Sequence, residues 1–311
     1  MRKDNRWHLK GTGNLLDSLL IEWKYFNIID KDIQGFFSYF EANPKNILNF
    51  ERTSVNARVF YKGKNYGEIN LLKHSNKKFS DKTAKAFFNK RDRIEVINKD
   101  KYQIFGENKQ LKWDLVFRRL AKPVQKKYFL EKKQYIVWRA EMPIAKVNGA
   151  IELKKENKRI KVDSFGYSDG NWGRWIFPSH MWFWMNYSKS FSNKKDLFFV
   201  ASELYNDDKR NIIIKTGNKK IEFDNFDIEK VIRKKKKIDI PIKTRIYAKK
   251  GNCRLEVETE EINSDLIFIK TPLFFPNFYL VNQIAKINGY LKLNNKLTKI
   301  DGKVMLEYTT K

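Results

Sequence analysis

Polar residues that are capable of acid–base and hydrogen-bonding chemistry lie near the middle of this 311-residue chain, between Asp163 and Tyr187. They are interspersed there with four tryptophans and three phenylalanines. A carboxylate among so many aromatic side chains is costly to bury unless it accepts hydrogen bonds or is protonated. The polar candidates are Tyr167, Asp169, Asn171, Arg174 and His180.

Two interpretations of Asp169 are open at the level of the sequence. If an extended segment continues through Gly170, its two-residue period places Tyr167, Asp169 and Asn171 on the same face of a strand. Alternatively, the sequence at 168–171 is favourable for a turn in which the Asp169 carboxylate bonds its own backbone. The first interpretation makes Asp169 a candidate acid, and the second makes it a turn residue.

The neighbouring polar residues also have two interpretations each. Tyr167 either acts together with Asp169 or is a core tyrosine that satisfies a buried carbonyl, and Asn171 is more typical of a structural position. Arg174 is a candidate ion-pair partner of Asp169, which would keep the carboxyl ionised and defeat an acid role. His180 is a candidate proton relay, although a single histidine is more typical of a surface position.

Tryptophans are concentrated around these polar residues. Five of the eight fall within residues 138–184, and aromatic residues make up 15% of the chain. Such a density either fills a core or lines a pocket, and we expect four of the indoles to serve as core or pocket wall. They are Trp138, Trp172, Trp182 and Trp184.

A two-residue period dominates the elements that must position these side chains. Apolar and polar residues alternate over 55–61, and the sequence KGKN then marks a tight turn into a returning strand. Helical signals are confined to 12–20 and 272–286. The same strand pattern predicts further hairpins with turns at Glu156–Asn157, Gly217–Asn218, Gly251–Asn252 and Asp301–Gly302.

Many short strands joined by tight turns indicate an all-β sandwich or barrel. A chain of 311 residues is longer than one eight-stranded barrel requires, so we expect two β domains, at 1–175 and 176–311. Cys253 is the single cysteine and the three histidines are widely spaced, so neither a disulfide framework nor a zinc site is expected.

The sequence gives no sign of a membrane or secretory segment. No apolar run approaches the roughly 18 residues of a membrane helix, and the first twenty residues lack the apolar centre of a signal peptide. We therefore expect a cytoplasmic protein, with peripheral contact at the inner membrane face as a further option.

The net charge of +28 favours anionic partners such as nucleic acids, lipid surfaces and acidic ligands. However, 49 of the 64 basic residues are lysines, which bind phosphate and guanine less specifically than arginines do. Their even spread is also explained by AT-rich codon usage, so a solvated basic surface is the simpler interpretation. The run at 233–237 indicates either a solvated strand entry or an anionic-membrane contact, and residues 126–128 supply a basic patch with an aromatic ring.

The sequence GYSDGNWG, at 166–173, resembles the GYxDxNWG signature of the lipocalin-like family that includes tocopherol cyclase, carotenoid 1,2-hydratase and related cyclases and lipid-binding proteins. Trp138, Pro143 and Gly149 are similar to the tryptophan, proline and glycine that precede this signature. Residues 288–308 resemble the closing hairpin of the family, which ends in a glutamate–aromatic pair. The resemblance covers most of the chain from about residue 130 onward.

This resemblance implies two lipocalin-like (calycin) antiparallel β-barrel domains packed side by side, with a ligand pocket near the signature. It implies that Asp169 and Tyr167 protonate an isoprenoid double bond, as in the hydratase and cyclase members, without a metal or an organic cofactor. The hydratases carry two histidines where this chain has Ile136 and Gly170. The expected ligand-binding residues are Trp138, Asn171, Trp172, Arg174, His180, Trp182 and Trp184.

Three functions stay open. A hydratase or intramolecular cyclase would use a neutral, buried Asp169 as the acid, and aromatic faces would stabilise the resulting carbocation by roughly 1–2 kcal/mol each. A lipid-binding or shuttling protein would use the same pocket without catalysis. A basic nucleic-acid-binding β protein is the third possibility, because it requires only the net charge and exposed aromatic residues.

Overall fold

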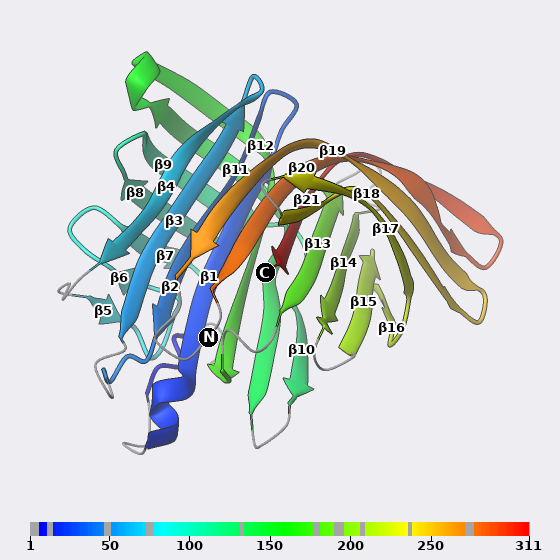
Figure 1. Ribbon diagram of the computed structural model, residues 1–311, viewed down its shortest axis with the longest axis horizontal. Coiled ribbons are helices and arrows are strands. Elements are labelled where there is room, and N and C mark those ends of the chain that lie inside the picture. The colour runs from blue at the N-terminus through cyan, green and yellow to red at the C-terminus, as the bar shows by residue number, and fades with distance from the viewer. Residues whose placement is uncertain are drawn as a thin grey trace. The chain divides into compact units, whose positions relative to one another are not determined.

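The computed structural model describes residues 6–10, 15–46, 51–72, 77–130, 134–176, 181–189, 196–205, 209–235, 238–270 and 277–310. The chain divides into two compact units, Met1–Phe177 and Pro178–Lys311, each built on one antiparallel sheet (Figure 1). Within the described residues, the helical elements are two 3₁₀ turns, η2 (Leu15–Leu19) and η4 (Lys154–Glu156). The predicted all-β, lipocalin-like fold class is thus confirmed.

The sheet of the first unit runs in the order β4-β3-β2-β1-β12-β11-β9-β8-β7-β6-β5, and β10 also pairs with β11. β1 and β12 are neighbours although they lie at opposite ends of the unit's sequence. The strands are β1 (Leu20–Ile29), β2 (Ile33–Ala42), β3 (Arg52–Tyr61), β4 (Lys64–Leu72), β5 (Lys78–Phe79), β6 (Ala86–Phe87), β7 (Arg93–Asn98), β8 (Lys101–Glu107), β9 (Leu111–Arg119), β10 (Val124–Phe129), β11 (Tyr135–Leu153) and β12 (Lys158–Arg174).

The sheet of the second unit runs in the order β16-β15-β14-β13-β21-β20-β19-β18-β17. Its first and last strands in the sequence are again not the edges of the sheet, because β13 pairs with β21. The strands are β13 (Trp182–Lys189), β14 (Leu197–Leu204), β15 (Lys209–Thr216), β16 (Lys219–Phe223), β17 (Asp227–Lys235), β18 (Ile238–Lys250), β19 (Cys253–Ile269), β20 (Phe278–Leu293) and β21 (Lys296–Thr310). In the part of the chain that the structure describes, no helix has the length and apolar character to cross a membrane.

Four of the predicted hairpin turns are confirmed by the strand pairing. The KGKN turn joins β3 to β4, and η4 with Asn157 joins β11 to β12. Gly217–Asn218 joins β15 to β16, and Gly251–Asn252 joins β18 to β19. In each case the residues on either side of the turn are directly paired across the two strands.

Two predictions of local structure are wrong. Asp301–Gly302 lies inside β21, and the chain turns instead at Asn294–Asn295, where Asn294 takes the left-handed φ of 53° that asparagine tolerates. Residues 278–286 form part of β20 and not a helix. Residues 281–285 are all buried, so the apolar–polar alternation that identifies a half-exposed strand is missing there. Residues 272–276 lie outside the described range. In the described part of the helical signal at 12–20, the chain forms the short turn η2, and residues 12–14 lie outside the described range.

Aromatic side chains fill the core of each unit. In the first, Trp113 Nε1 donates a hydrogen bond to Tyr39 Oη (3.0 Å), which donates in turn to the carbonyl of Phe105 (2.9 Å). In the second, Tyr187 stacks on Phe199 with ring centroids 5.4 Å apart. The polar groups of Trp113 and Tyr39 therefore have partners inside the core, and the apolar surfaces supply most of the stabilisation.

Gly149 is required by the close approach of β11 to β9. It has φ of 145°, and a Cβ at this position would lie 2.1 Å from the carbonyl oxygen of Asp114. The turn glycine Gly217 also has a positive φ, of 54°, but nothing lies within 4 Å of its missing Cβ. A side chain at Gly149 is thus disfavoured both by φ and by a backbone clash, whereas a side chain at Gly217 is disfavoured by φ alone.

We predict that Gly149→Ala destabilises the protein more than Gly217→Ala does. The first substitution combines an unfavourable φ with a backbone clash and is expected to lower the free energy of unfolding by about 3 kcal/mol. The second carries only the cost of a left-handed residue, about 1 kcal/mol. Thermal unfolding followed by circular dichroism measures both, and equal shifts would contradict the steric role of Gly149.

Candidate functional site

Asp169 lies in the middle of a strand. β12 is continuous from Lys158 to Arg174, and Asp169 is paired with Tyr25 of β1 on one side and with Ala140 of β11 on the other. The turn interpretation of Asp169 is therefore wrong. The strand interpretation is confirmed, because side chains two residues apart in a strand share a face.

The Asp169 side chain lies on the face of β12 that is opposite to the core of the first unit. Val162 belongs to that core, and a Cβ added at Gly166 would lie 2.7 Å from Val147 and 3.2 Å from Phe117, which are also core residues. Even-numbered positions of β12 thus face the core. Odd-numbered positions, including Asp169, face the other way, on a surface that we call the Asp169 face.

Two hydrogen bonds hold the Asp169 carboxyl. Trp138 Nε1 donates to Oδ2 at 2.8 Å, and the Tyr167 hydroxyl donates to the same oxygen at 2.6 Å. Asp169 is 4% exposed and Tyr167 is fully buried. Burial raises the pKa of Asp169 to about 7 against the opposing effects of Tyr167, Trp138 and the charge of Lys24. Burial and the neighbouring Asp169 carboxyl raise the pKa of Tyr167 well above its ordinary value.

Aromatic rings from β1 and β2 surround this carboxyl on the Asp169 face. Tyr25, the direct neighbour of Asp169, packs edge-on against Tyr167 with centroids 6.3 Å apart and stacks on Phe36 at 6.1 Å. Two residues before Tyr25 and on the same face of β1, Trp23 contacts the rings of Phe40 and Trp175. In the sequence, the alternation of Trp23 and Tyr25 is the signal that would have placed both on one strand face.

The other predicted residues in β12 are separated by the alternation of the strand. Asn171 is half-buried on the Asp169 face, between Trp23 of β1 and Trp138 of β11. Arg174 forms an ion pair with the buried Asp17 at 3.1 Å, so the alternative in which Arg174 pairs with Asp169 and keeps it ionised is wrong. Asp169 thus has no cationic hydrogen-bond partner among the described residues, which is compatible with a neutral carboxyl.

Trp172 lies on the core-facing side of β12 and not with Asp169. Its indole stacks on the imidazole of His8, with centroids 4.1 Å apart and planes 3° apart. Trp182 and Trp184 belong to β13 of the second unit, where Trp182 Nε1 donates to Glu307 Oε1 at 2.9 Å. His180 lies outside the described residues. Of the four predicted indoles, the described contacts place Trp138 at the carboxyl.

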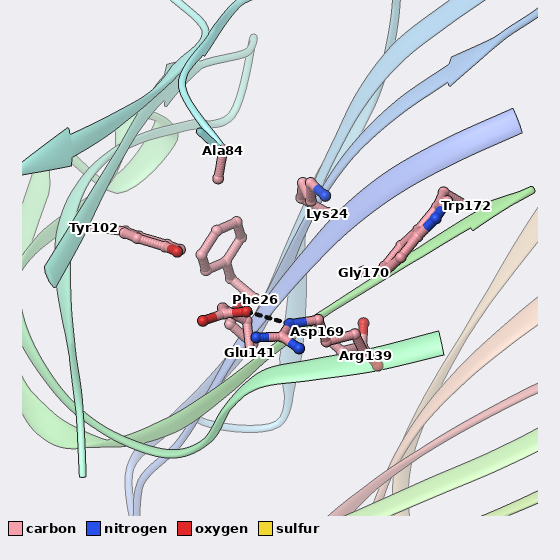
Figure 2. Close-up of a pocket in the computed structure, with 10 residues that line it drawn as sticks. Lys24, Phe26, Ala84, Tyr102, Arg139, Glu141, Asp169, Gly170 and Trp172 are labelled. Atoms are coloured by element: carbon pink, nitrogen blue, oxygen red, sulfur yellow. Dashed lines mark hydrogen bonds and ion pairs between the residues drawn. The ribbon is translucent and has the colours of Figure 1, made fainter. Parts of the chain in front are cut away.

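A small, charged cavity lies on the core-facing side of β12. Figure 2 shows Lys24, Tyr102, Arg139, Glu141 and Trp172 around it. Its volume is about 10 Å³, room for about one water molecule. This cavity is therefore too small to hold a long apolar ligand.

The charges around this cavity are paired. Lys24 Nζ lies 2.6 Å from Glu22 Oε1. Burial opposes ionisation of Glu22, but Lys24 and His8 outweigh it and hold the pKa of Glu22 below its ordinary value. Arg139 Nε donates to Glu141 Oε2 at 2.6 Å. No local motif marks these pairs in the sequence, because each partner is recognisable only once the strands are in register.

Two further features concern binding of other partners. In the described part of the chain, no three His, Cys, Asp or Glu side chains gather closely enough to hold a metal ion. The basic patch at 126–128 lies on β10, where Lys127 Nζ is 4.5 Å from the ring centroid of the exposed Phe129.

No family model matches the chain, and no curated protein matches its sequence. Solved structures do match its fold. CghA, crystallised with Sch210972, has a TM-score of 0.65 at 9% identity, covering 94% of this chain and 88% of its own. Kievitone hydratase from Nectria haematococca has a TM-score of 0.66 at 10% identity, with 93% and 88% covered.

A protein from Nitrosomonas europaea assigned as an AttH has a TM-score of 0.68 at 12% identity, and the match covers 98% of each chain. At this level of identity the likeness concerns the fold. The chain has the lipocalin-like β fold that is shared by CghA, kievitone hydratase and the AttH protein.

Proposed function

We propose that this protein binds an apolar molecule of the isoprenoid class and that Asp169 donates a proton to a carbon–carbon double bond of it. The observation that carries the proposal is the buried Trp138–Asp169–Tyr167 cluster. A carboxyl with a pKa of about 7 retains its proton in a substantial fraction of molecules at neutral pH, as an acid catalyst requires.

The geometry favours proton donation from one particular oxygen. Both hydrogen bonds from Tyr167 and Trp138 go to Oδ2. Within the described residues, Oδ1 has no hydrogen-bond partner, so we assign the transferable proton to Oδ1. The partners on Oδ2, with the charge of Lys24, then stabilise the carboxylate that is left after the transfer.

The proposed step balances without a cofactor. The alkene π electrons form a new C–H bond with the proton of Asp169, and the other alkene carbon becomes a tertiary carbocation. A water molecule or a hydroxyl group of the substrate then supplies an electron pair to that carbon. The proton released from this oxygen returns to the Asp169 carboxylate, which restores the acid.

The aromatic residues of the Asp169 face suit such a cation. Tyr25, Trp23 and Trp138 lie around the carboxyl, and an aromatic face stabilises a desolvated cation by about 2 kcal/mol. Tyr25 is buried, whereas Trp23 and Asn171 are half-buried, so the substrate is expected to approach from the Trp23–Asn171 end. Asn171 and Trp138 would contact it there.

The comparisons support a small-molecule ligand. CghA was crystallised with Sch210972, and kievitone hydratase is named for a hydration. The proposed function gives hydration when water captures the cation and ring closure when a substrate hydroxyl does. A non-catalytic lipid-binding or shuttling protein would use the same Asp169 face, and the first experiment below separates the two.

A cytoplasmic location with contact at the inner membrane face is part of the proposal. The proposed membrane contact rests on the basic run at 233–237, because polybasic segments are attracted to anionic lipid. Arg233 is paired with Glu261 at 2.7 Å, and Lys236 and Lys237 lie outside the described residues.

The acid role predicts transfer of solvent hydrogen to carbon. An organic extract of the purified protein, analysed by mass spectrometry, supplies the ligand, which is then incubated with fresh protein in D₂O. Wild-type protein should yield a product with one carbon-bound deuterium. Asp169→Asn should reduce this yield by about 100-fold or more, since general acid catalysis contributes that much.

Asp163→Asn is the matched control, because Asp163 lies on the same strand but is exposed and paired with Lys146. It should leave the deuterium yield unchanged. A deuterated product formed equally well by Asp169→Asn would refute the acid role. Recovery of unmodified ligand from every variant would instead assign the protein to the binding-only function.

We also predict that Tyr167→Phe shifts the alkaline limit of activity upward. The Tyr167 hydroxyl favours the ionised form of Asp169, so its removal raises the pKa of Asp169 further above 7. A charge-assisted hydrogen bond of about 1.5 kcal/mol corresponds to about one pH unit. Activity requires the protonated acid, so the activity of Tyr167→Phe should decline at a pH about one unit higher than that of the wild type. An unchanged or lower limit would contradict this role.

A further inference from the structure

The side chain of Asn282, in β20, is completely buried and has no hydrogen-bond partner. Its exposed fraction is 0%, and neither Oδ1 nor Nδ2 has a partner anywhere in the described part of the chain. An unpaired buried amide destabilises a fold and is rare in native proteins. Both polar atoms of the Asn282 amide are therefore available to hydrogen-bond a ligand.

The adjacent residue shows the contrast. Gln283 is 2% exposed, and its Nε2 donates to the carbonyl of Pro241 at 2.7 Å. It is paired with Leu306, a residue of the second unit's core, so it lies on the core side of β20. Two buried amides thus stand next to each other in one strand, one satisfied inside the core and one unsatisfied on the opposite face.

Asn282 lies in a polar row that crosses four strands. Trp184 is paired with Glu307, Glu307 with Asn282, and Asn282 with Asp265. Directly paired residues point to the same face of a sheet. We call these four residues the Asn282 row.

On the same face the row is bordered mainly by apolar residues, together with Asn186 and Thr309, which are paired with Met305 and Leu280. Ile284 and Met305 are paired with each other on one side of the row, and both are fully buried. Ile267 and Leu280 are paired on the other side. A ligand at the Asn282 row would therefore place its polar group at the amide and apolar parts against these neighbours.

The chemistry of the row selects the polar group. The amide donates two hydrogen bonds and accepts others, whereas the carboxylates of Glu307 and Asp265 only accept. An anionic group would be repelled by the two carboxylates, and a hydrocarbon would leave the amide unsatisfied. A hydroxyl group both donates and accepts, so it satisfies an amide and a carboxylate together.

We propose that the Asn282 row binds the hydroxyl group of an otherwise apolar ligand. The inference rests on the proposed function only for the apolar character of that ligand, because binding at the row needs no step at Asp169. It names the ligand class more closely, as an alcohol of a long hydrocarbon.

The test compares farnesol with farnesene, which has the same branched chain without the hydroxyl. Binding is followed by isothermal titration calorimetry and by the fluorescence of tryptophan, since Trp184 is part of the row. Wild-type protein should bind farnesol at least tenfold more tightly than farnesene. Asn282→Leu, which keeps a side chain of similar size, should abolish the preference. Asn282→Ala, which shortens the side chain, should abolish it as well.

Thermal unfolding without ligand provides an independent reading. Asn282→Leu should raise the midpoint by about 2–4 °C, because it removes an unsatisfied buried amide. Gln283→Leu is the matched control and should lower the midpoint, because it leaves the Pro241 carbonyl without its donor. A lower midpoint for both variants would show that Asn282 has a structural role and would overturn the inference.

The inference is equally overturned if wild-type protein does not prefer farnesol or if Asn282→Leu retains the preference. Its failure is distinguishable from failure of the acid role, which is measured separately by deuterium incorporation. Loss of deuterium incorporation with an intact farnesol preference would refute the acid role and still support the alcohol-binding site.

Discussion

Burial of the Asp169 carboxyl is the constraint on which the candidate site depends. A change in pKa from 3.8 to about 7 means that the folded protein binds a proton that the unfolded chain releases between these values. Stability contributed by this group is thus lost as the pH rises from about 4 to about 7, by roughly 4 kcal/mol in all. That is a large part of the stability of an ordinary domain. The two donors on Oδ2 limit this penalty without removing it.

The side chains of β12 alternate between the two faces of the sheet, so the strand contributes residues to two different environments. Its even positions face the core of the first unit, where Gly166 and Ser168 leave room for neighbouring side chains. Its odd positions present Tyr167, Asp169 and Asn171 to the opposite face. The charge of Lys24 belongs to the core-facing side, yet it favours ionisation of Asp169 across the sheet. Asp169 is also among the residues that line the small charged cavity, and the charge of Lys24 links the two electrostatically.

The sequence predicted features that depend on neighbouring residues, but it did not predict contacts that depend on which strands pair and in what register. The two-residue period predicted the all-β class and placed Tyr167 and Asp169 together on one face. The contacts with Tyr25 and Lys24 could not be predicted, because β1 and β12 are joined through more than a hundred residues. The pairing of Arg174 with Asp17 could not be predicted either, because Asp17 lies even further away in the chain, and the sequence offered Asp169 only as a candidate partner. Asn282 has no motif at all: its missing partners are evident only when every neighbour is placed.

The central claim is that Asp169 is neutral in a large fraction of molecules near pH 7. The most direct measurement is a carbon-13 NMR titration of the aspartate side-chain carboxyls, with Asp169 assigned by its loss in Asp169→Asn. We expect its resonance to titrate with a midpoint of about 7. A midpoint near 4 would show an ordinary ionised aspartate and would contradict the acid role.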